Sequence, residues 1–174
     1  MTDGLFDPFR HNAWATRKLI AFCRELGPER LRAAAPGTYG TVLETLQHML
    51  GAEHRYLSRI AGGRPEWSAE PEEIDDLGEL NRMAEDLATT WEGVITAGFD
   101  SDRVVSFISR STGEPNEAAA GMLVAQTLHH GNEHRAQIFS FLSSVGLDPP
   151  ELDGWGYGLE TGRFRELGQD ASRA

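Results

Sequence analysis

Four segments with helical periodicity constrain the fold of this chain more than any other feature. They run from about Pro8 to Leu26, from Thr41 to Ala61, from Asp76 to Ala97 and from Gly121 to Val145. In each segment, apolar residues recur at the three- and four-residue spacing of an amphipathic helix. Helices with one apolar face bury that face against each other, so the pattern predicts an all-α fold, an up-down four-helix bundle.

Start and stop signals support these boundaries. Asp7-Pro8 supplies an N-cap side chain followed by a proline at the first helical position. Thr41 and Glu44 have the spacing of a capping box at the start of the second segment. Gly146 is typical of a helix stop after the fourth segment.

The remaining segments are shorter or irregular. The β-branched and aromatic residues of Val104–Ser109 predict a short strand or a hairpin across Gly113, before the fourth long helix, although NEAAA is a weak return arm. EWSAEPEEID is expected to be a polar loop. The glycine- and aromatic-rich tail, about 150–174, is expected to pack irregularly on the surface, with frayed last residues. Without internal repeats, 174 residues suit a single domain, 1–174.

Charge and hydropathy exclude some classes of function. The net charge is −11, with a pI near 4.9, which opposes binding to nucleic acid. No apolar run approaches the roughly 20 residues that span a bilayer, and the N-terminus lacks the pattern of a signal peptide. Cys23 is the single cysteine, so no intrachain disulfide can form. A cytoplasmic protein that contacts neither membranes nor nucleic acid is the simplest expectation.

The stretch HHGNEHRAQI, residues 129–138, contains three histidines and predicts a metal site. His130 and His134 are four residues apart, about 40° on a helix, the spacing at which two imidazoles bind one ion. His129 lies about 140° from His134 and is excluded. His48 lies in mid-helix on the second segment. The three histidines His48, His130 and His134 can therefore meet at one level of the bundle.

Other candidates near this site have competing interpretations. Glu44 is either a fourth ligand, a carboxylate that orients an imidazole, or the partner of Thr41 in the capping box, which we favour. His54 lies about 120° from His48 and is expected to face solvent. His11 either lines a pocket or is exposed, and exposure is favoured.

The remaining reactive residue types give weaker signals. Cys23 follows Phe22 on the first helix and is expected to be a small buried apolar residue. Arg135 either contacts an acidic cosubstrate or makes a surface or dimer ion pair, and the ion pair is favoured. The chain has no G-x-S-x-G, P-loop or dinucleotide-binding fingerprint. Four tryptophans are interpreted as core and cap packing: Trp14, Trp67, Trp91 and Trp155.

Three motifs together resemble the DinB superfamily, over roughly residues 5–150. HNAWATRKLI resembles the family's opening N-x-W-A-N segment, with Thr16 in place of the usual asparagine. LETLQHMLGAEHRYLSRIAGG resembles its second-helix signature, a histidine and then an acidic residue, here His48 and Glu53. LHHGNEHRAQI resembles its H-x-x-x-H-R-G-Q-I signature, with Ala136 where glycine is usual.

The resemblance implies an up-down four-helix bundle with a metal bound by His48, His130 and His134. Waters would complete the coordination and leave an open position, and zinc or nickel is the expected metal. The resemblance also implies a homodimer, and a metal-dependent thiol transferase or hydrolase that acts on a small molecule. A low-molecular-weight thiol would be the cosubstrate of an S-transferase, the leading hypothesis. The alternative is a non-catalytic dimeric metal-binding or stress-response module.

Overall fold

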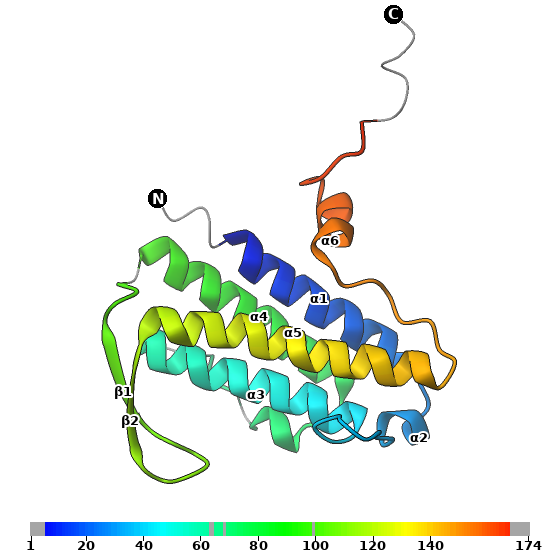
Figure 1. Ribbon diagram of the computed structural model, residues 1–174, viewed down its shortest axis with the longest axis horizontal. Coiled ribbons are helices and arrows are strands. Elements are labelled where there is room, and N and C mark those ends of the chain that lie inside the picture. Colours follow the sequence, from blue (N-terminus) through cyan, green and yellow to red (C-terminus); the bar gives the residue numbers. More distant parts are fainter. Residues whose placement is uncertain (1–5, 63–64, 68, 99, 168–174) are drawn as a thin grey trace, which may run out of the picture.

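The computed structural model describes residues 6–62, 65–67, 69–98 and 100–167, and four long helices dominate it (Figure 1). The long helices are α1 (Phe6–Arg24), α3 (Val42–Ala61), α4 (Leu77–Ala97) and α5 (Ala120–Ser144). The short elements are α2 (Pro28–Leu31), the 3₁₀ turn η2 (Pro71–Glu73), strands β1 (Val104–Ile108) and β2 (Pro115–Ala119), and α6 (Gly154–Thr161). The predicted all-α bundle, with a hairpin before its fourth long helix, is confirmed.

The helices pack in the spatial order α1, α4, α3, α5, and α5 closes the ring against α1. α1 and α4 run in opposite directions, because Phe9 near the start of α1 stacks on Trp91 near the end of α4. α3 and α4 run in the same direction, since Ile60 and Val94, near their C-terminal ends, border one groove. The link between α3 and α4 therefore returns along the bundle, and it carries η2 back to the side of α3. The strict up-down order that the sequence predicted is consequently broken between these two helices.

The core of the bundle is apolar and extends across all four long helices. Its largest fully buried side chains are Trp91, Leu19, Ile20, Leu46, Leu50, Leu57, Leu80, Leu87, Ile95, Leu123, Ile138 and Leu142. Removal of this much apolar surface from water is the dominant favourable term in folding. The apolar cluster includes buried side chains from all four long helices.

The helix starts agree with the sequence in two places and differ in one. Thr41 accepts a hydrogen bond from the Glu44 backbone N–H, and the Glu44 carboxylate accepts one from the Thr41 backbone N–H at 2.8 Å. The favoured interpretation of Glu44 as the capping-box partner is correct. Asp76, the expected start of the third segment, caps α4 by accepting a hydrogen bond from the Gly78 backbone N–H. α1 begins at Phe6, so Asp7 lies in its first turn and the predicted Asp7 cap is wrong.

The hairpin pairs β1 with β2 from Val104↔Ala119 to Ile108↔Pro115, so the return arm forms despite its weak strand propensity. Its inner face packs on α3, where the guanidinium of Arg59 lies 4.0 Å from the centre of the Phe107 ring. Backbone pairing and this packing outweigh propensity. The hairpin thereby borders the C-terminal half of α3.

The tail is more ordered than predicted up to residue 167. It contains the short helix α6, which follows the long helices (Figure 1). α6 contacts α1, where Trp14 and Lys18 donate hydrogen bonds to the Glu160 carboxylate. The prediction of an irregular tail is therefore wrong for the residues of α6. The expected fraying of the last residues falls on 168–174, outside the described residues. Among the residues that the structure describes, no helix combines the length and apolar character needed to cross a membrane.

Candidate metal centre

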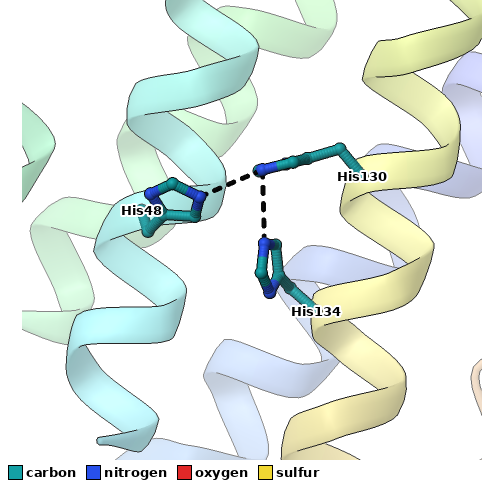
Figure 2. A group of neighbouring side chains, drawn as sticks. All are labelled: His48, His130 and His134. Atoms are coloured by element: carbon teal, nitrogen blue, oxygen red, sulfur yellow. Dashed lines mark hydrogen bonds between the residues drawn. The ribbon is translucent and has the colours of Figure 1, made fainter. Parts of the chain in front are cut away.

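Figure 2 shows the three predicted ligands pointing toward one another, His48 from α3 and His130 and His134 from α5. His130 Nε2 lies 3.0 Å from His48 Nε2 and 3.2 Å from His134 Nε2. One ligand atom from each of the three residues falls within 4.8 Å of the others. Imidazole nitrogens at the usual distance of about 2.0–2.1 Å from a tetrahedral Zn²⁺ lie about 3.3 Å apart. The donor set therefore fits one transition-metal ion.

The helix geometry explains this convergence. His130 and His134 lie one turn apart on the face of α5 that packs against α3. His48 projects from the middle of α3 at the same level of the bundle. His129 is exposed and stays outside the cluster, as predicted. His134 is buried and the other two cluster members are half-buried, so the site lies at the edge of the core.

Gln137 fixes which nitrogen of His134 faces the cluster. Its side-chain oxygen accepts a hydrogen bond from the Tyr39 backbone N–H at 3.3 Å, and it lies 2.8 Å from His134 Nδ1. An oxygen in this position can only accept, so Nδ1 of His134 carries the proton. Nε2 of His134 is then left with its lone pair free for a metal, which is how outer hydrogen bonds orient a ligating imidazole.

The Gln137→Ala variant is expected to bind zinc about 10–100-fold more weakly than the wild type, the usual cost of losing an outer partner of a ligating histidine. The variant keeps all three imidazoles but loses the acceptor that fixes His134. A competition titration against a chromophoric chelator measures the affinity. The matched control is Gln126→Ala, which removes an exposed glutamine from the same helix. Equal weakening in both variants would contradict this role for Gln137.

Aromatic rings border the cluster. Tyr39 stacks on His48, with ring centres 3.8 Å apart, and meets His134 edge-on at 5.6 Å. Tyr56 approaches His130 edge-on at 6.0 Å. Tyr39 itself is 57% exposed, so it covers one side of the cluster without closing it. Sequence reasoning missed Tyr39, because it lies in the turn before α3, outside any periodic segment.

Both half-buried histidines are neutral at pH 7. Burial, followed by the charges of His134 and then Arg55, lowers the pKa of His48 to about 4. Burial also lowers the pKa of His130 to about 4, with His134 and His48 as the next causes. A metal competes with protons for the same lone pairs, so an imidazole that is already neutral binds it without releasing a proton.

Zinc affinity is therefore expected to fall little between pH 7 and pH 5 on account of His48 and His130. Two imidazoles with the ordinary pKa of about 6.5 would together weaken binding about 600-fold from pH 7 to pH 5. With both pKa values at about 4, the combined loss is less than about twofold. Chelator competition at pH 5, 6 and 7 measures it. A loss of about 600-fold would mean that these two histidines take up protons in the metal-free protein as free imidazoles do.

A buried polar network lies behind the cluster. Arg135 is 3% exposed and donates to Asn12 Oδ1 at 2.8 Å and to Thr16 Oγ1 at 3.0 Å. Asn12 in turn donates to the Glu53 carboxylate at 3.1 Å. The favoured prediction that Arg135 makes a surface or dimer ion pair is therefore wrong. A Cβ at Gly131 would lie 2.7 Å from Asn12 Oδ1, so only glycine allows the helices to approach this closely.

The two charges of this network modify each other. Burial raises the pKa of Glu53, opposed by the Asn12 hydrogen bond, the Arg135 charge and the nearby Trp91. Burial lowers the pKa of Arg135 to about 10, and the charge of Glu53 opposes that shift. Asn12 relays between them, with its oxygen toward the guanidinium and its amide toward the carboxylate. The network ties α1, α3 and α5 together directly beside His134.

The predicted exposure of two other histidines is wrong. His54 is 2% exposed, stacks on Trp67 at 4.3 Å and lies 3.0 Å from the Pro65 carbonyl oxygen, so its predicted solvent exposure is wrong. His11 is half-buried, and its Nε2 lies 2.8 Å from the Leu152 carbonyl oxygen, so its favoured exposure is also wrong. Both are covered by chain segments that follow or link the long helices.

Cys23 is buried as predicted, and burial raises the pKa of its thiol to about 12. Trp91 packs in the core, but Trp155 is exposed, so the packing prediction is wrong for Trp155. A thiol with this pKa holds its proton at neutral pH and is a poor nucleophile.

Comparison with known sequences agrees with the fold and the cluster. The sequence profile described as the DinB family matches residues 1–163. No curated protein sequence gives a significant match.

Proposed function

This chain belongs to the DinB family, and we propose that His48, His130 and His134 bind one divalent transition metal that serves a thiol-dependent S-transferase reaction. The convergence of three ring nitrogens within 4.8 Å carries the proposal. The neutral state of His48 and His130 and the fixed tautomer of His134 support it. Zinc or nickel suits three imidazoles, and the family resemblance favours the same metals.

Three neutral ligands leave the full charge of the metal to act on a thiol or water in its open position, whose pKa it lowers. Burial keeps His48 and His130 unprotonated, and the contact of Gln137 with Nδ1 of His134 leaves Nε2 toward the cluster. The exposed ring of Tyr39 stacks on His48 at the surface side of the site. In S-transfer, the thiol gives up its proton and its sulfur bonds to an electrophilic carbon. The bond from that carbon to the leaving group breaks, and the leaving group departs with the electron pair.

The thiol in this reaction comes from a cosubstrate. Cys23, the single cysteine of the chain, is buried with its thiol pKa at about 12. Among the residues that the structure describes, the ligand groups that converge at the cluster are those of His48, His130 and His134, and Cys23 is not one of them. A low-molecular-weight thiol that enters from solvent can occupy the open side.

The alternative function is a dimeric module in which the metal is structural. The apolar core argues against this alternative, because it joins the four long helices without the histidines. Binding of a structural metal contributes free energy of folding, so removal of such a metal would unfold the chain. We also propose that the chain forms a homodimer, as the family resemblance implies, and sedimentation of the purified protein tests this.

Metal content and thiol transfer test the proposal in turn. We expect close to one zinc or nickel per chain by mass spectrometry of untagged protein, and none in His48→Ala. Metal-loaded and metal-free protein are then assayed with a chromogenic aryl halide and a panel of cysteine, glutathione and bacillithiol. Acceleration that requires both metal and one thiol is the expected result. A metal-loaded protein that accelerates none of these reactions would overturn the transferase proposal and favour the binding module.

A further inference from the structure

Three charged side chains meet beside the histidine cluster, and the metal site proposed above makes no use of them. Arg55 Nη1 donates to Glu72 Oε1 at 2.7 Å, and Arg110 Nη1 donates to the same oxygen at 3.2 Å. The three residues come from α3, η2 and the turn of the hairpin. The structure therefore brings two guanidinium groups around one carboxylate oxygen, an arrangement that arginine pairs use to bind carboxylates.

Arg55, the member of this pair that lies on α3, is on the same face of the helix as His48. Arg55 follows His48 by seven residues, which is two turns and about 10.5 Å along the helix. Side chains on a helix lean toward its N-terminus, so the guanidinium of Arg55 leans toward His48.

The Glu72 carboxylate lies against α3 between the positions of His48 and Arg55. Its carboxylate atoms lie 2.5–2.7 Å from where a Cβ of Gly51 would be. Gly51 is three residues, less than one turn, beyond His48 on α3. The Glu72 carboxylate therefore lies against the helix surface between His48 and Arg55. A small molecule with one end at the metal site could therefore place a carboxylate at its other end in the position that Glu72 now occupies.

The local charge favours an anion. Two arginines face one glutamate, and a metal at three neutral imidazoles would add further positive charge, although the chain as a whole carries −11. The Arg110 side chain is 70% exposed, and those of Arg55 and Glu72 are 23% and 31% exposed. Burial raises the pKa of Glu72, but the hydrogen bond from Arg55 and other contacts outweigh it and hold the pKa below its ordinary value.

We propose that Arg55 and Arg110 bind a carboxylate group of the cosubstrate, which replaces Glu72 between them. The proposal rests on the function proposed above and names its substrate class, a small acidic thiol. Glu72 holds the two guanidinium groups in place in the free protein and competes with the incoming carboxylate. Arg110 lies on the exposed hairpin turn, whereas Arg55 lies on α3 and its side chain is less exposed, so Arg55 supplies the half of this carboxylate receptor that belongs to the bundle.

Two thiols of equal length test the proposal on the cobalt-loaded protein, 6-mercaptohexanoate and 6-mercaptohexanol. The sulfur-to-cobalt absorption band reports the dissociation constant of each. We expect the acid to bind about 10-fold more tightly than the alcohol, which corresponds to one charge-assisted hydrogen-bonded contact. Arg55→Gln should remove this preference and leave the affinity for the alcohol unchanged. Glu72→Gln should increase the preference, because the competing carboxylate is gone.

The matched control is Arg17→Gln, which breaks a surface ion pair with Glu85 on α1 and α4 and should keep the wild-type preference. A merely structural role for the three charges would shift the affinities for both thiols together in Arg55→Gln and in Glu72→Gln. Equal dissociation constants for the acid and the alcohol in the wild type would overturn the proposal.

Failure of the metal site is distinguished from failure of the receptor. If cobalt does not bind, the function proposed above is wrong, and the receptor is tested alone on metal-free Glu72→Gln with hexanoate. Hexanoate should then shift the NMR signals of Arg55, and the shift should vanish in the Arg55→Gln/Glu72→Gln double variant. No shift in metal-free Glu72→Gln would overturn the receptor as well.

Discussion

The His130→Ala variant is expected to lose its metal and keep its fold. His130 Nε2 is the nitrogen that faces both of the others, at 3.0 and 3.2 Å, so its removal leaves two donors that no longer share a neighbour. Loss of an outer partner weakens metal affinity about 10–100-fold, and loss of a ligand should exceed the upper end of that range. The variant should therefore bind zinc more than about 100-fold more weakly than the wild type.

Stability should hardly change in the same variant. The His130 side chain is half-buried and is not part of the apolar core. The free energy of unfolding of the metal-free variant should therefore stay within about 1 kcal/mol of that of the metal-free wild type. Chelator competition measures affinity and urea denaturation measures stability, with His129→Ala as the control from the neighbouring exposed position. If the metal-free wild type already unfolds, the metal is structural and the non-catalytic module becomes the better account.

Helical periodicity predicted the bundle because burial of one apolar face per helix leaves few ways to arrange four long helices. Capping at Thr41 followed from local chemistry, since a capping box needs only residues three apart in sequence. The pairing of His130 and His134 followed from the pitch of one helix. These features share a short range in sequence, and each is visible without knowledge of the tertiary contacts.

Placement of His48 needed more than the pitch of one helix. The level at which α3 meets α5 depends on loop lengths and packing, and the sequence supplied only a mid-helix position and the family resemblance. The structure brings His48 Nε2 within 3.0 Å of His130 Nε2. Gln137 and Tyr39 complete the site through a backbone N–H and a stacked ring, contacts that no periodic pattern encodes.

The wrong predictions concern polar residues that other segments cover. A position about 120° from the apolar stripe faces solvent on an isolated helix, but the link that carries Pro65 and Trp67 covers His54. The glycine-rich sequence of α6 has low helix propensity, yet the contacts of Trp14 and Lys18 with Glu160 dock it on α1. Tertiary contacts decide burial in both cases.

The Arg135→Met variant is expected to lose about 3 kcal/mol of stability, the lower end of the range for breaking a buried charge pair. Arg135 is 3% exposed and is the cation whose charge lowers the pKa of Glu53. Methionine fills a similar volume but leaves the Glu53 carboxylate half-buried without a cation and Asn12 Oδ1 without its donor. The lower end applies because Glu53 keeps some contact with water. Urea denaturation measures the loss.

The pH dependence of this loss identifies its cause. Without Arg135, the folded-state pKa of Glu53 rises further above its unfolded value, so the folded protein binds the extra proton. Stability of the variant therefore falls as pH rises through that range, and the deficit should be smaller at pH 5 than at pH 8. Glu53→Gln combined with Arg135→Met should recover part of the loss, because no buried charge remains. A deficit that is independent of pH and unchanged in the double variant would instead mean that Arg135 stabilises the bundle by packing alone.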